Sequence, residues 1–594
     1  MTHGTFDHIK SSRQQWWLVI ASGVFSLVCG TIGVWQYEHE PPVGDNSPLA
    51  CFFISVYHAL QMLILHTPHL EKKTNFCLEV GRWCGAFTLV GATLMLLWKR
   101  LWHEFKLVRL WRWKDHIVVC GLGQKGMQII RCRKEQDRHE RVVVIDRNPE
   151  EKLVDACAKL GVPVLVGDAA EERWLKQARV YCAREAFVIT PADETNVRIA
   201  TEIRRLSRDK NNSQMECFVH LENIHLRERL QRLSGKTAAE DHGGTLKFFD
   251  VFDNEARKIL LELPLDGDGI GNSDPRTVHV VILGFGRMGR SLAFRAAKMG
   301  HFANRKPLRI SVIDPCAALQ REHFLFRYPM LEKQDICQMT FYETGAETLA
   351  ARQRIEGWAA EPDTLLHLFV CVEDNASAVE IGLRLQEALV DRSDCCLHVR
   401  IKTRSSLAAI LESAQTAGPR MVAFGMVEDT CCTGTFRNEI NEPVARSLHA
   451  GYIADLVKRR AAGENLPKKP AEVPWDELAE EFRESNRQAA DHIAIKARAL
   501  GYHVGDLKKN SNPIRTLNRE QKRILAPMEH ARWCAERWLA GWIHCKERND
   551  ELHRHPDLVP WQELGDPERR IDHAQIEQLA DALAENTQGI YQSE

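Results

Sequence analysis

The sequence predicts an α/β protein in which a helical membrane region precedes two tandem Rossmann-like parallel-sheet domains and a mainly helical C-terminal domain. Long uncharged apolar runs occur only before residue 99, and glycine-rich motifs at 116–126 and 279–289 each follow a β-rich run. From about Glu442 strand-like runs give way to charged, helix-favouring sequence. A chain of 594 residues exceeds one hydrophobic core. We therefore expect four regions, at 1–114, 115–265, 276–435 and 440–594.

The composition of the chain bears on three kinds of partner or cross-link: nucleic acid, disulfides and metal ions. The formal net charge of −1 and the isoelectric point of about 7.1 give no argument for a nucleic-acid partner. The 18 cysteines contain no Cys-x-x-Cys pair, so reduced buried thiols are favoured over a disulfide framework or a zinc site. The histidines also lack ligand spacing, and we expect no bound metal.

The first apolar run, from Trp16 to Tyr37, carries no charge. At about 1.5 Å per residue a helix there reaches roughly 33 Å, enough to cross a bilayer. Aromatic residues at its two ends are typical of interfacial anchors. A second helix is expected at about 78–98, where the run from Trp83 to Trp98 is again uncharged.

Between these helices, residues 49–66 are apolar but interrupted by polar side chains, which is typical of a third span or of a re-entrant pore helix. Charge favours the re-entrant form. The stretch from Lys99 to Lys114 is strongly basic and therefore cytoplasmic, and the basic N-terminus needs an even number of spans to lie on the same side. We expect a multi-pass inner (plasma) membrane protein with both termini and the large C-terminal region in the cytoplasm.

The first glycine motif places Gly121, Gly123 and Gly126 directly after the strand that begins at His116. Such glycines permit a tight turn and let a pyrophosphate approach the N-terminus of the next helix. A second strand ends at Asp146, whose carboxylate would accept hydrogen bonds from ribose hydroxyls. The cofactor expected here is NAD or another adenine nucleotide. The alternative is that the glycines serve only to pack the helix on the strand.

The second motif contains Gly284, Gly286 and Gly289, and its second strand ends at Asp314. Residues 344–346 lack the acid found at the corresponding point of the first copy, so ligand binding is less strongly indicated here. A redox enzyme would need a substrate domain with a positioned acid or base, and no segment between the motifs is long enough. We therefore expect no enzymatic activity and no catalytic residues.

The first copy continues with a short strand before Asp168, then a strand that ends at Thr190, followed by Asp193. This alternation closely resembles an RCK domain, also called the Trk-type N-terminal domain. The resemblance implies that Asp146, Asp168, Thr190 and Asp193 surround a nucleotide. The order of a helix, a pore helix, a second helix and then RCK domains resembles the architecture of potassium channels. This resemblance implies a homotetramer that conducts ions.

One departure from that architecture concerns the selectivity filter. Potassium filters contain glycines whose carbonyls replace the hydration shell of the ion, whereas residues 63–71 contain none. Four polar side chains there are candidates for a different pore mouth or are ordinary interfacial residues. They are His66, Thr67, His69 and Glu71.

The last region carries Glu-His-x-x-Trp at 529–533, Gly-Trp at 541–542 and His-Pro-x-Leu-Val-Pro at 555–560. These motifs resemble the ryanodine-receptor repeat (RyR) domain over roughly 440–590. Spacing places His530, Trp533 and Arg537 on one helical face, where they could stack a base and hold a phosphate. The alternative is that the tryptophans of this region are core residues.

Together these features predict a ligand-gated ion channel or channel-like membrane protein, gated by nucleotides that bind its cytosolic domains. The missing glycines motivate a second hypothesis, a defence effector that permeabilises the membrane when a nucleotide signal arrives. A third is a membrane-anchored nucleotide sensor that does not conduct.

Overall fold

The computed structural model describes most of the chain. The described residues are 6–38, 48–63, 75–223, 226–227, 229–231, 244–392, 394–402, 411, 418–426, 441–466, 468–507 and 512–592. They fall into two compact units, residues 1–113 with 155–163 and residues 114–154 with 164–594.

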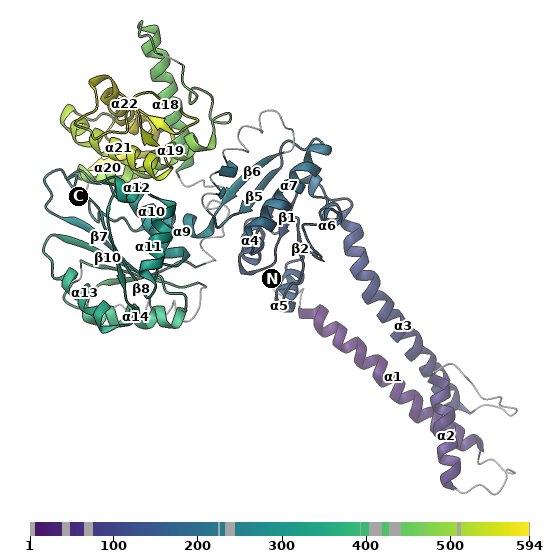
Figure 1. The fold of residues 1–594 in the computed structure, drawn as a ribbon. Coiled ribbons are helices and arrows are strands. Elements are labelled where there is room, and N and C mark those ends of the chain that lie inside the picture. Colours follow the sequence, from purple (N-terminus) through teal and green to yellow (C-terminus); the bar gives the residue numbers. More distant parts are fainter. Residues whose placement is uncertain are drawn as a thin grey trace. The chain divides into compact units, whose positions relative to one another are not determined.

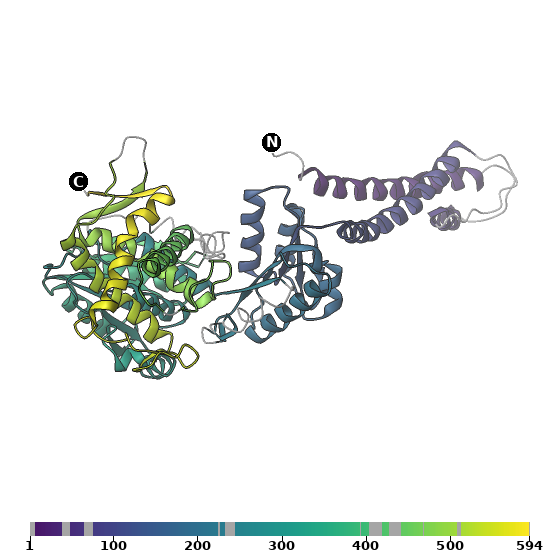
Figure 2. The same ribbon diagram turned by 90° about the horizontal axis from the view of Figure 1, so that it is seen from above.

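The first unit is built from three helices, α1 (Phe6–Glu38), α2 (Pro48–Leu63) and α3 (Phe76–Leu110). Helices α1 and α3 run side by side (Figure 2), and small residues let them approach closely. A β-carbon at Gly33 would lie 2.5 Å from the backbone nitrogen of Leu78, and one at Gly81 would lie 2.8 Å from that of Gly30. The buried Ser26 hydroxyl donates to the Gly81 carbonyl at 2.7 Å. Small residues and hydroxyl hydrogen bonds are typical of helix pairs in lipid.

The outer surface of this unit is apolar. Val24 is 56% exposed and Phe87 67%, whereas the polar Ser26 is fully buried, so large apolar side chains face outward on this unit. The described residues contain one helix segment long and apolar enough to cross a membrane, Val19–Gln36, by length and composition alone. The predicted pore helix at 49–66 corresponds to α2, which ends at Leu63. The four pore-mouth candidates lie outside the described residues.

The second unit begins with a six-stranded parallel sheet in the order β3-β2-β1-β4-β5-β6. Its strands are β1 (His116–Cys120), β2 (Val142–Asp146), β3 (Val164–Val166), β4 (Ala183–Val188), β5 (Glu216–His220) and β6 (Thr245–Phe249). Its helical segments are α4 (Gln124–Gln136), α5 (Glu151–Lys159), α6 (Glu172–Gln177), the 3₁₀ turn η1 (Val180–Cys182) and α7 (Asp193–Asp209).

Helix α9 (Val251–Glu262) leads into a second parallel sheet of the same topology, β12-β11-β10-β7-β8-β9. Its strands are β7 (Thr277–Leu283), β8 (Arg309–Asp314), β9 (Gln338–Glu343), β10 (Thr364–Val370), β11 (Cys396–Arg400) and β12 (Arg420–Phe424). Its helices are α10 (Arg287–Met299), α11 (Ala317–Arg327), α12 (Met330–Lys333), α13 (Leu349–Ala359) and α14 (Asn375–Ala388). The predicted pair of parallel α/β domains is confirmed (Figure 1).

Alternation along β7 divides the second domain into two cores. Val281 and Leu283 face a core formed with α13 and α14. Val280 and Ile282 face the opposite core, which continues through α9, α10 and α11 into the C-terminal helices. The second α/β domain and the C-terminal domain therefore share one continuous hydrophobic core.

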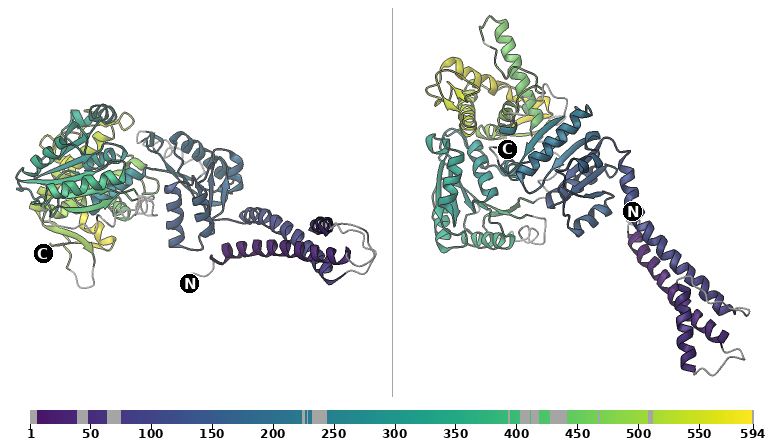
Figure 3. Two further views of the ribbon diagram at one scale, coloured as in Figure 1. Left: turned by 90° about the horizontal axis from the view of Figure 1, so that it is seen from below. Right: turned by 45° about the vertical axis from the view of Figure 1, so that its right-hand side comes forward.

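The C-terminal domain is mainly helical, as predicted, with two short two-stranded sheets (Figure 3). Its elements are α18 (Glu442–Ala461), α19 (Glu480–Asp491), α20 (Ile493–Ala499), β13 (Tyr502–Asp506), α21 (Arg519–Leu539), β14 (Ile543–His544), β15 (Arg554–His555), α22 (Asp566–Glu577), α23 (Leu579–Glu585) and β16 (Gln588–Gln592). A capping box at Asn518 and Gln521 begins α21.

Candidate functional site

The glycine turn of the first domain lies where β1 and β4 adjoin, the point at which the strand order reverses. Ligands of open parallel sheets bind at this point, beyond the carboxyl ends of the strands. Gly121 has a φ of +111°, and a β-carbon there would lie 2.7 Å from the Ile189 carbonyl oxygen. At Gly126 a β-carbon would lie 2.1 Å from the Gly121 carbonyl oxygen. Both positions therefore need glycine for the fold itself.

Gly123, unlike Gly121 and Gly126, is not required by the backbone geometry of the turn. It is the N-cap of α4, with φ −92° and ψ −169°, which is extended backbone open to any residue. A β-carbon there meets no described atom within 4 Å, so the fold does not explain the glycine. Backbone N–H groups at a helix N-terminus bind anions, and open space at this point leaves room for a phosphate. This is the expected place for the pyrophosphate.

Asp146, at the end of β2, holds this turn in place. Its Oδ2 accepts the Leu122 N–H at 2.6 Å and its Oδ1 accepts the Asn148 N–H at 2.8 Å. An ionised carboxylate has about four lone-pair sites, so two such bonds leave capacity for ribose hydroxyls. Asp146 thus has a bracing role that the sequence analysis did not identify, alongside the predicted contact with ribose.

The remaining predicted residues of the first site hold neighbouring loops. Asp168 accepts the Ala170 N–H at 2.9 Å. Asp193 accepts the Glu222 and Asn223 N–H groups at 3.0 and 2.9 Å, so both of its oxygens brace the loop after β5. The structure places these carboxylates in loop-stabilising hydrogen bonds, and their contact with a nucleotide stays a prediction.

Thr190 takes part in a buried network centred on Asn196, which the sequence analysis missed. The Thr190 hydroxyl donates to Asn196 Oδ1 at 2.6 Å, and Asn196 Nδ2 donates to the carbonyls of Thr190 and His220 at 2.9 Å. Asn196 is fully buried and ties the ends of β4 and β5. A polar residue on the inward face of a helix one turn after Asp193 was the available signal.

A cation, also missed, lies at the same helix N-terminus. Lys125 Nζ is 3.2 Å from His220 Nε2 and 4.0 Å from a Glu222 carboxylate oxygen. Arg287, beside the second glycine turn, forms an ion pair with the same Glu222. Arg327 of α11 donates to Asn223 at 2.9 Å. The loop after β5 therefore links the glycine-turn helices of the two α/β domains.

The second glycine turn repeats the first. Gly284 has a φ of +92°, a β-carbon at Gly289 would lie 2.3 Å from the Gly284 carbonyl oxygen, and Gly286 has open space. Asp314 accepts the Phe285 N–H at 2.7 Å and the Cys316 N–H at 2.8 Å, as Asp146 does in the first copy. The backbone cradle is therefore present in both domains.

The three candidates of the C-terminal domain lie on α21 as predicted, but inside the domain. His530 is buried, its Nδ1 lies 3.2 Å from Asp572, and its Nε2 lies 2.8 Å from the Val559 carbonyl. Burial alone would lower the pKa of His530, but hydrogen bonds with Asp572 and Cys534 outweigh it and raise that pKa to about 10. Both ring nitrogens thus face acceptors, which fits an imidazolium.

The other two candidates have internal contacts as well. The Trp533 ring lies 5.0 Å from that of His555. Arg537 pairs with Glu481 at 3.0 Å and lies over the Trp542 ring at 5.0 Å, and Trp542 is itself buried. These contacts favour the alternative reading, in which this helix face is part of the core, over a binding face for a nucleotide.

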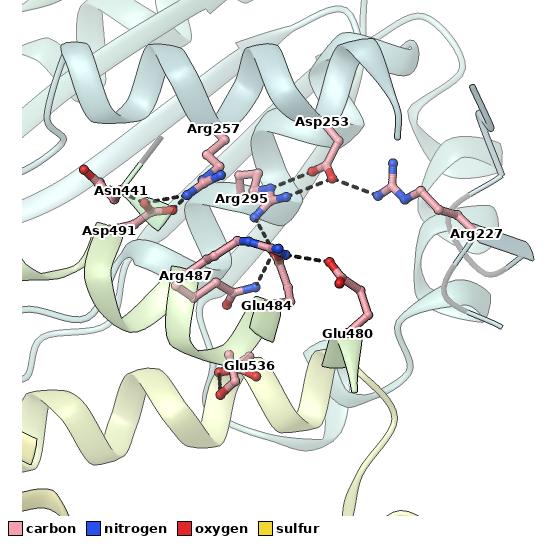
Figure 4. Close-up of polar contacts among 12 residues, drawn as sticks. Arg227, Asp253, Arg257, Arg295, Asn441, Glu480, Glu484, Arg487, Asp491 and Glu536 are labelled. Atoms are coloured by element: carbon pink, nitrogen blue, oxygen red, sulfur yellow. Dashed lines mark hydrogen bonds and ion pairs between the residues drawn. The ribbon is translucent and has the colours of Figure 1, made fainter. Parts of the chain in front are cut away.

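A buried charge cluster connects the domains through α9 (Figure 4). The Asp253 carboxylate accepts two hydrogen bonds from the Arg295 guanidinium of α10, at 2.6 and 2.9 Å, and one from the Arg227 guanidinium at 2.8 Å. Arg257 binds Asp491 of α19 through two parallel hydrogen bonds of 2.6 and 2.8 Å, with both side chains 3% exposed. Paired guanidinium and carboxylate groups of this kind fix orientation as well as distance. Helix α9 is therefore held to both α10 and the C-terminal domain.

Comparison with known proteins identifies two segments. Residues 117–234 match the TrkA-N domain, and residues 515–589 match the RyR domain. An uncharacterized protein of Methanocaldococcus jannaschii is 34% identical over 91 residues, 15% of this chain and 18% of that one. One of Methanothermus fervidus is 25% identical over 122 residues, 20% of this chain and 19% of that one. The chain thus spans about a fifth of the length of each relative.

Two solved structures also show some likeness. The structure of GsuK bound to ADP is 14% identical, covering 73% of this chain and 99% of that one with a TM-score of 0.36. The NAD(P)-binding domain of an exopolyphosphatase-related protein from Archaeoglobus fulgidus is 14% identical, covering 25% and 98% with a TM-score of 0.20. Likeness at this level carries no inference about function.

Both predicted resemblances are confirmed within the matched segments. The chain contains a TrkA-N domain, a nucleotide-binding fold, at the first glycine motif, and an RyR domain near its C-terminus.

Proposed function

We propose that this protein is a ligand-gated channel or channel-like membrane protein whose opening is controlled by an adenine nucleotide bound at the first glycine turn. The observation that carries the proposal is one chain that joins two features. A helical hairpin with a small-residue interior and an apolar exterior ends at Leu110, and the TrkA-N match begins seven residues later in sequence, at Ile117. The hairpin suits lipid, and the domain suits a soluble ligand.

In this proposal the nucleotide phosphates lie at the N-terminus of α4, next to Gly123, and the ribose lies against Asp146. Lys125 is placed to add a positive charge beside the phosphates, as the residue two positions after the open glycine. NAD or another adenine nucleotide fits this arrangement. We propose no chemical step: the protein is a sensor and not an enzyme.

Gating follows as a population shift. A nucleotide that prefers one arrangement of the α/β domains by 10-fold biases that arrangement by about 1.4 kcal/mol per subunit. The loop after β5, held by Asp193 and paired through Glu222 to Arg287, is the element that passes the change to the second domain. A homotetramer of hairpins in the inner membrane would sum the four contributions.

A second candidate function rests on residues 63–71, which lack the glycines of a potassium filter. Under this alternative the pore is closed at rest and leaks without selectivity once the nucleotide binds, as expected of a membrane-permeabilising effector. A non-conducting, membrane-anchored sensor is the third possibility.

Reconstitution distinguishes these functions. The full chain is placed in liposomes loaded with potassium and with a small anionic dye, and efflux is followed as NAD, ADP or ATP is added. Nucleotide-dependent potassium efflux without dye supports a selective channel, and release of both supports the effector. Absence of efflux with every nucleotide, from protein that binds one of them in detergent, overturns conduction.

The matched variant is Gly123→Ala, which adds a methyl group at the expected phosphate position without meeting a described atom within 4 Å. Efflux that remains nucleotide-dependent in this variant would remove the first glycine turn as the gating site.

A further inference from the structure

Two adjacent strands of the second sheet bring three metal-ligand side chains together. His367 lies on β10, and Cys396 and His398 lie on β11, where His367 pairs with Cys396 and Phe369 with His398. Alternation along each strand places all three on one face, the face that packs toward α9. One nitrogen from each imidazole and the thiol sulfur all lie within 4.8 Å of one another.

Three of the four imidazole nitrogens in this cluster have no hydrogen-bond partner among the described residues. His398 is 1% exposed, and within the described part of the chain neither of its ring nitrogens has a hydrogen-bond partner, although its ring faces are covered by Phe369 at 4.3 Å and His367 at 5.9 Å. Stacking accounts for the faces of the ring and leaves the polar edge unsatisfied. An unsatisfied buried polar group destabilises the fold, so an apolar ring would be the more stable occupant of this position.

His367 is held in the form that a metal needs. Its Nε2 lies 3.0 Å from the Leu265 carbonyl oxygen, so Nε2 carries the proton and donates it. Nδ1, which is buried and has no partner in the ranges that the structure describes, is then the unprotonated nitrogen. A histidine that ligates a metal through one nitrogen typically donates a hydrogen bond from the other, often to a backbone carbonyl.

Cys396 supplies both the softest ligand and the route of entry. It is the first residue of β11 and is partly exposed, whereas both histidines are buried. Burial raises the pKa of its thiol, and the charge of Arg420, the residue paired with it on β12, acts in the opposite direction. A cation that reaches this sulfur would displace the proton and bind the thiolate.

We propose that His367, Cys396 and His398 bind one borderline-soft d10 cation, Zn²⁺ or Cu⁺. Two imidazoles and a thiolate suit both ions, and carboxylate-preferring ions such as Mg²⁺ or Ca²⁺ are excluded by the donor set. Ligand atoms around such an ion stand about 3.5 Å apart, given bond lengths of about 2.0–2.3 Å, so the side chains close in by roughly 1 Å. The bound ion would cross-link β10 and β11 below α9. Sequence spacing missed this site because its ligands come from two strands.

The test uses the full chain, stripped with a chelator and then offered one equivalent of Zn²⁺ in air or of Cu⁺ under anaerobic reducing conditions. Metal content after equilibrium dialysis gives stoichiometry, and Co²⁺ substitution reports sulfur ligation through its thiolate charge-transfer absorption. We expect one equivalent of at least one ion in the native protein, with binding weakened at least 10-fold in Cys396→Ser and His398→Phe.

Cys395→Ala is the matched control, because the neighbouring thiol is buried in the opposite core and should not affect binding. His398→Phe keeps the ring stack and removes the unsatisfied nitrogens, so without metal it should melt no earlier than the native chain. If it does melt early, the half-buried Cys396→Ser decides the question. Failure of both ions to bind, or binding and absorption that persist in Cys396→Ser, overturns the proposal.

Discussion

Replacing single glycines of the two turns separates the ligand from the fold. At Gly123 the backbone is extended and a β-carbon meets no described atom within 4 Å. Alanine there loses the preference of an N-cap for glycine, about 1 kcal/mol, and regains about 0.4–1 kcal/mol by restricting the unfolded chain. We therefore expect Gly123→Ala to change the free energy of unfolding by less than about 1 kcal/mol.

Gly126→Ala is the opposite case. Its new β-carbon would lie 2.1 Å from the Gly121 carbonyl oxygen, which belongs to the backbone of the turn and has no flexible side chain to move away. Helix α4 must then shift off β1, at a cost of about 1–3 kcal/mol for overpacking or more. Each substitution adds one methyl group, and the two sites are three residues apart. Gly123→Ala should nevertheless disturb ligand binding, whereas Gly126→Ala should disturb the fold.

The assay combines titration calorimetry with NAD and ADP and thermal unfolding of the same samples. In Gly123→Ala we expect affinity to fall at least 10-fold, or about 1.4 kcal/mol, with the unfolding midpoint nearly unchanged. The same pair in the second domain, Gly286→Ala and Gly289→Ala, tells which turn is occupied, because its geometry repeats the first. Unchanged affinity in both Gly123→Ala and Gly286→Ala would refute a pyrophosphate at either helix N-terminus.

Three further predictions concern the charge cluster, the RyR domain and the hairpin. Asp253→Asn removes the carboxylate charge that two buried arginines share, so that Arg295 keeps Glu484 at 3.2 Å and Arg227 keeps Asp250 at 3.8 Å. It should lower the free energy of unfolding by about 3–5 kcal/mol in denaturant unfolding, whereas Glu356→Gln, in an exposed pair, should change it by less than about 1 kcal/mol. The pKa of His530 is raised in the folded protein, so its contribution to the free energy of unfolding is full below about pH 6.5. This contribution is lost as the pH rises toward 10, which denaturant unfolding at a series of pH values would measure. That pH dependence should become clearly weaker in Asp572→Asn, where only Cys534 still raises the pKa of His530, and an unchanged pH dependence would exclude the Asp572 pair as its main origin. Gly33→Leu should separate α1 from α3, read as loss of cross-linking between cysteines placed on them, and efficient cross-linking would contradict the close packing.

The sequence predicts the α/β domains well because their signals are local. A glycine turn after a β-rich run, followed by a strand that ends in an acid, describes each domain within about 35 residues, and both form the expected turn. The amphipathic pattern from Trp475 to Leu500 predicts one helix there, whereas α19 begins at Glu480 and a break at His492 separates it from α20. Helix ends depend on local caps and packing that hydrophobic periodicity does not encode.

Roles that depend on tertiary contacts could not be predicted from spacing. The periodicity of α21 correctly placed His530 and Arg537 on one face, but whether that face meets solvent or another helix depends on Asp572 and Glu481, which are distant in sequence. The same holds for α9, where charged residues that usually mark a solvated face are buried against partners in α10 and α19. Asn196 was missed for this reason too, because its two partners, Thr190 and His220, lie at the ends of different strands.

The core shared by the second α/β domain and the C-terminal domain bears on how this chain can be taken apart. Residues of β7 and α10 belong to the same apolar cluster as residues of α20 and α21, so a cut near 440 would open an interior and not a linker. Expression of residues 440–594 alone should therefore yield aggregating protein, whereas residues 250–594, which retain α9, should fold as one cooperative unit. The sequence distinguishes the second α/β domain from the C-terminal domain, but the two form a single unit of folding.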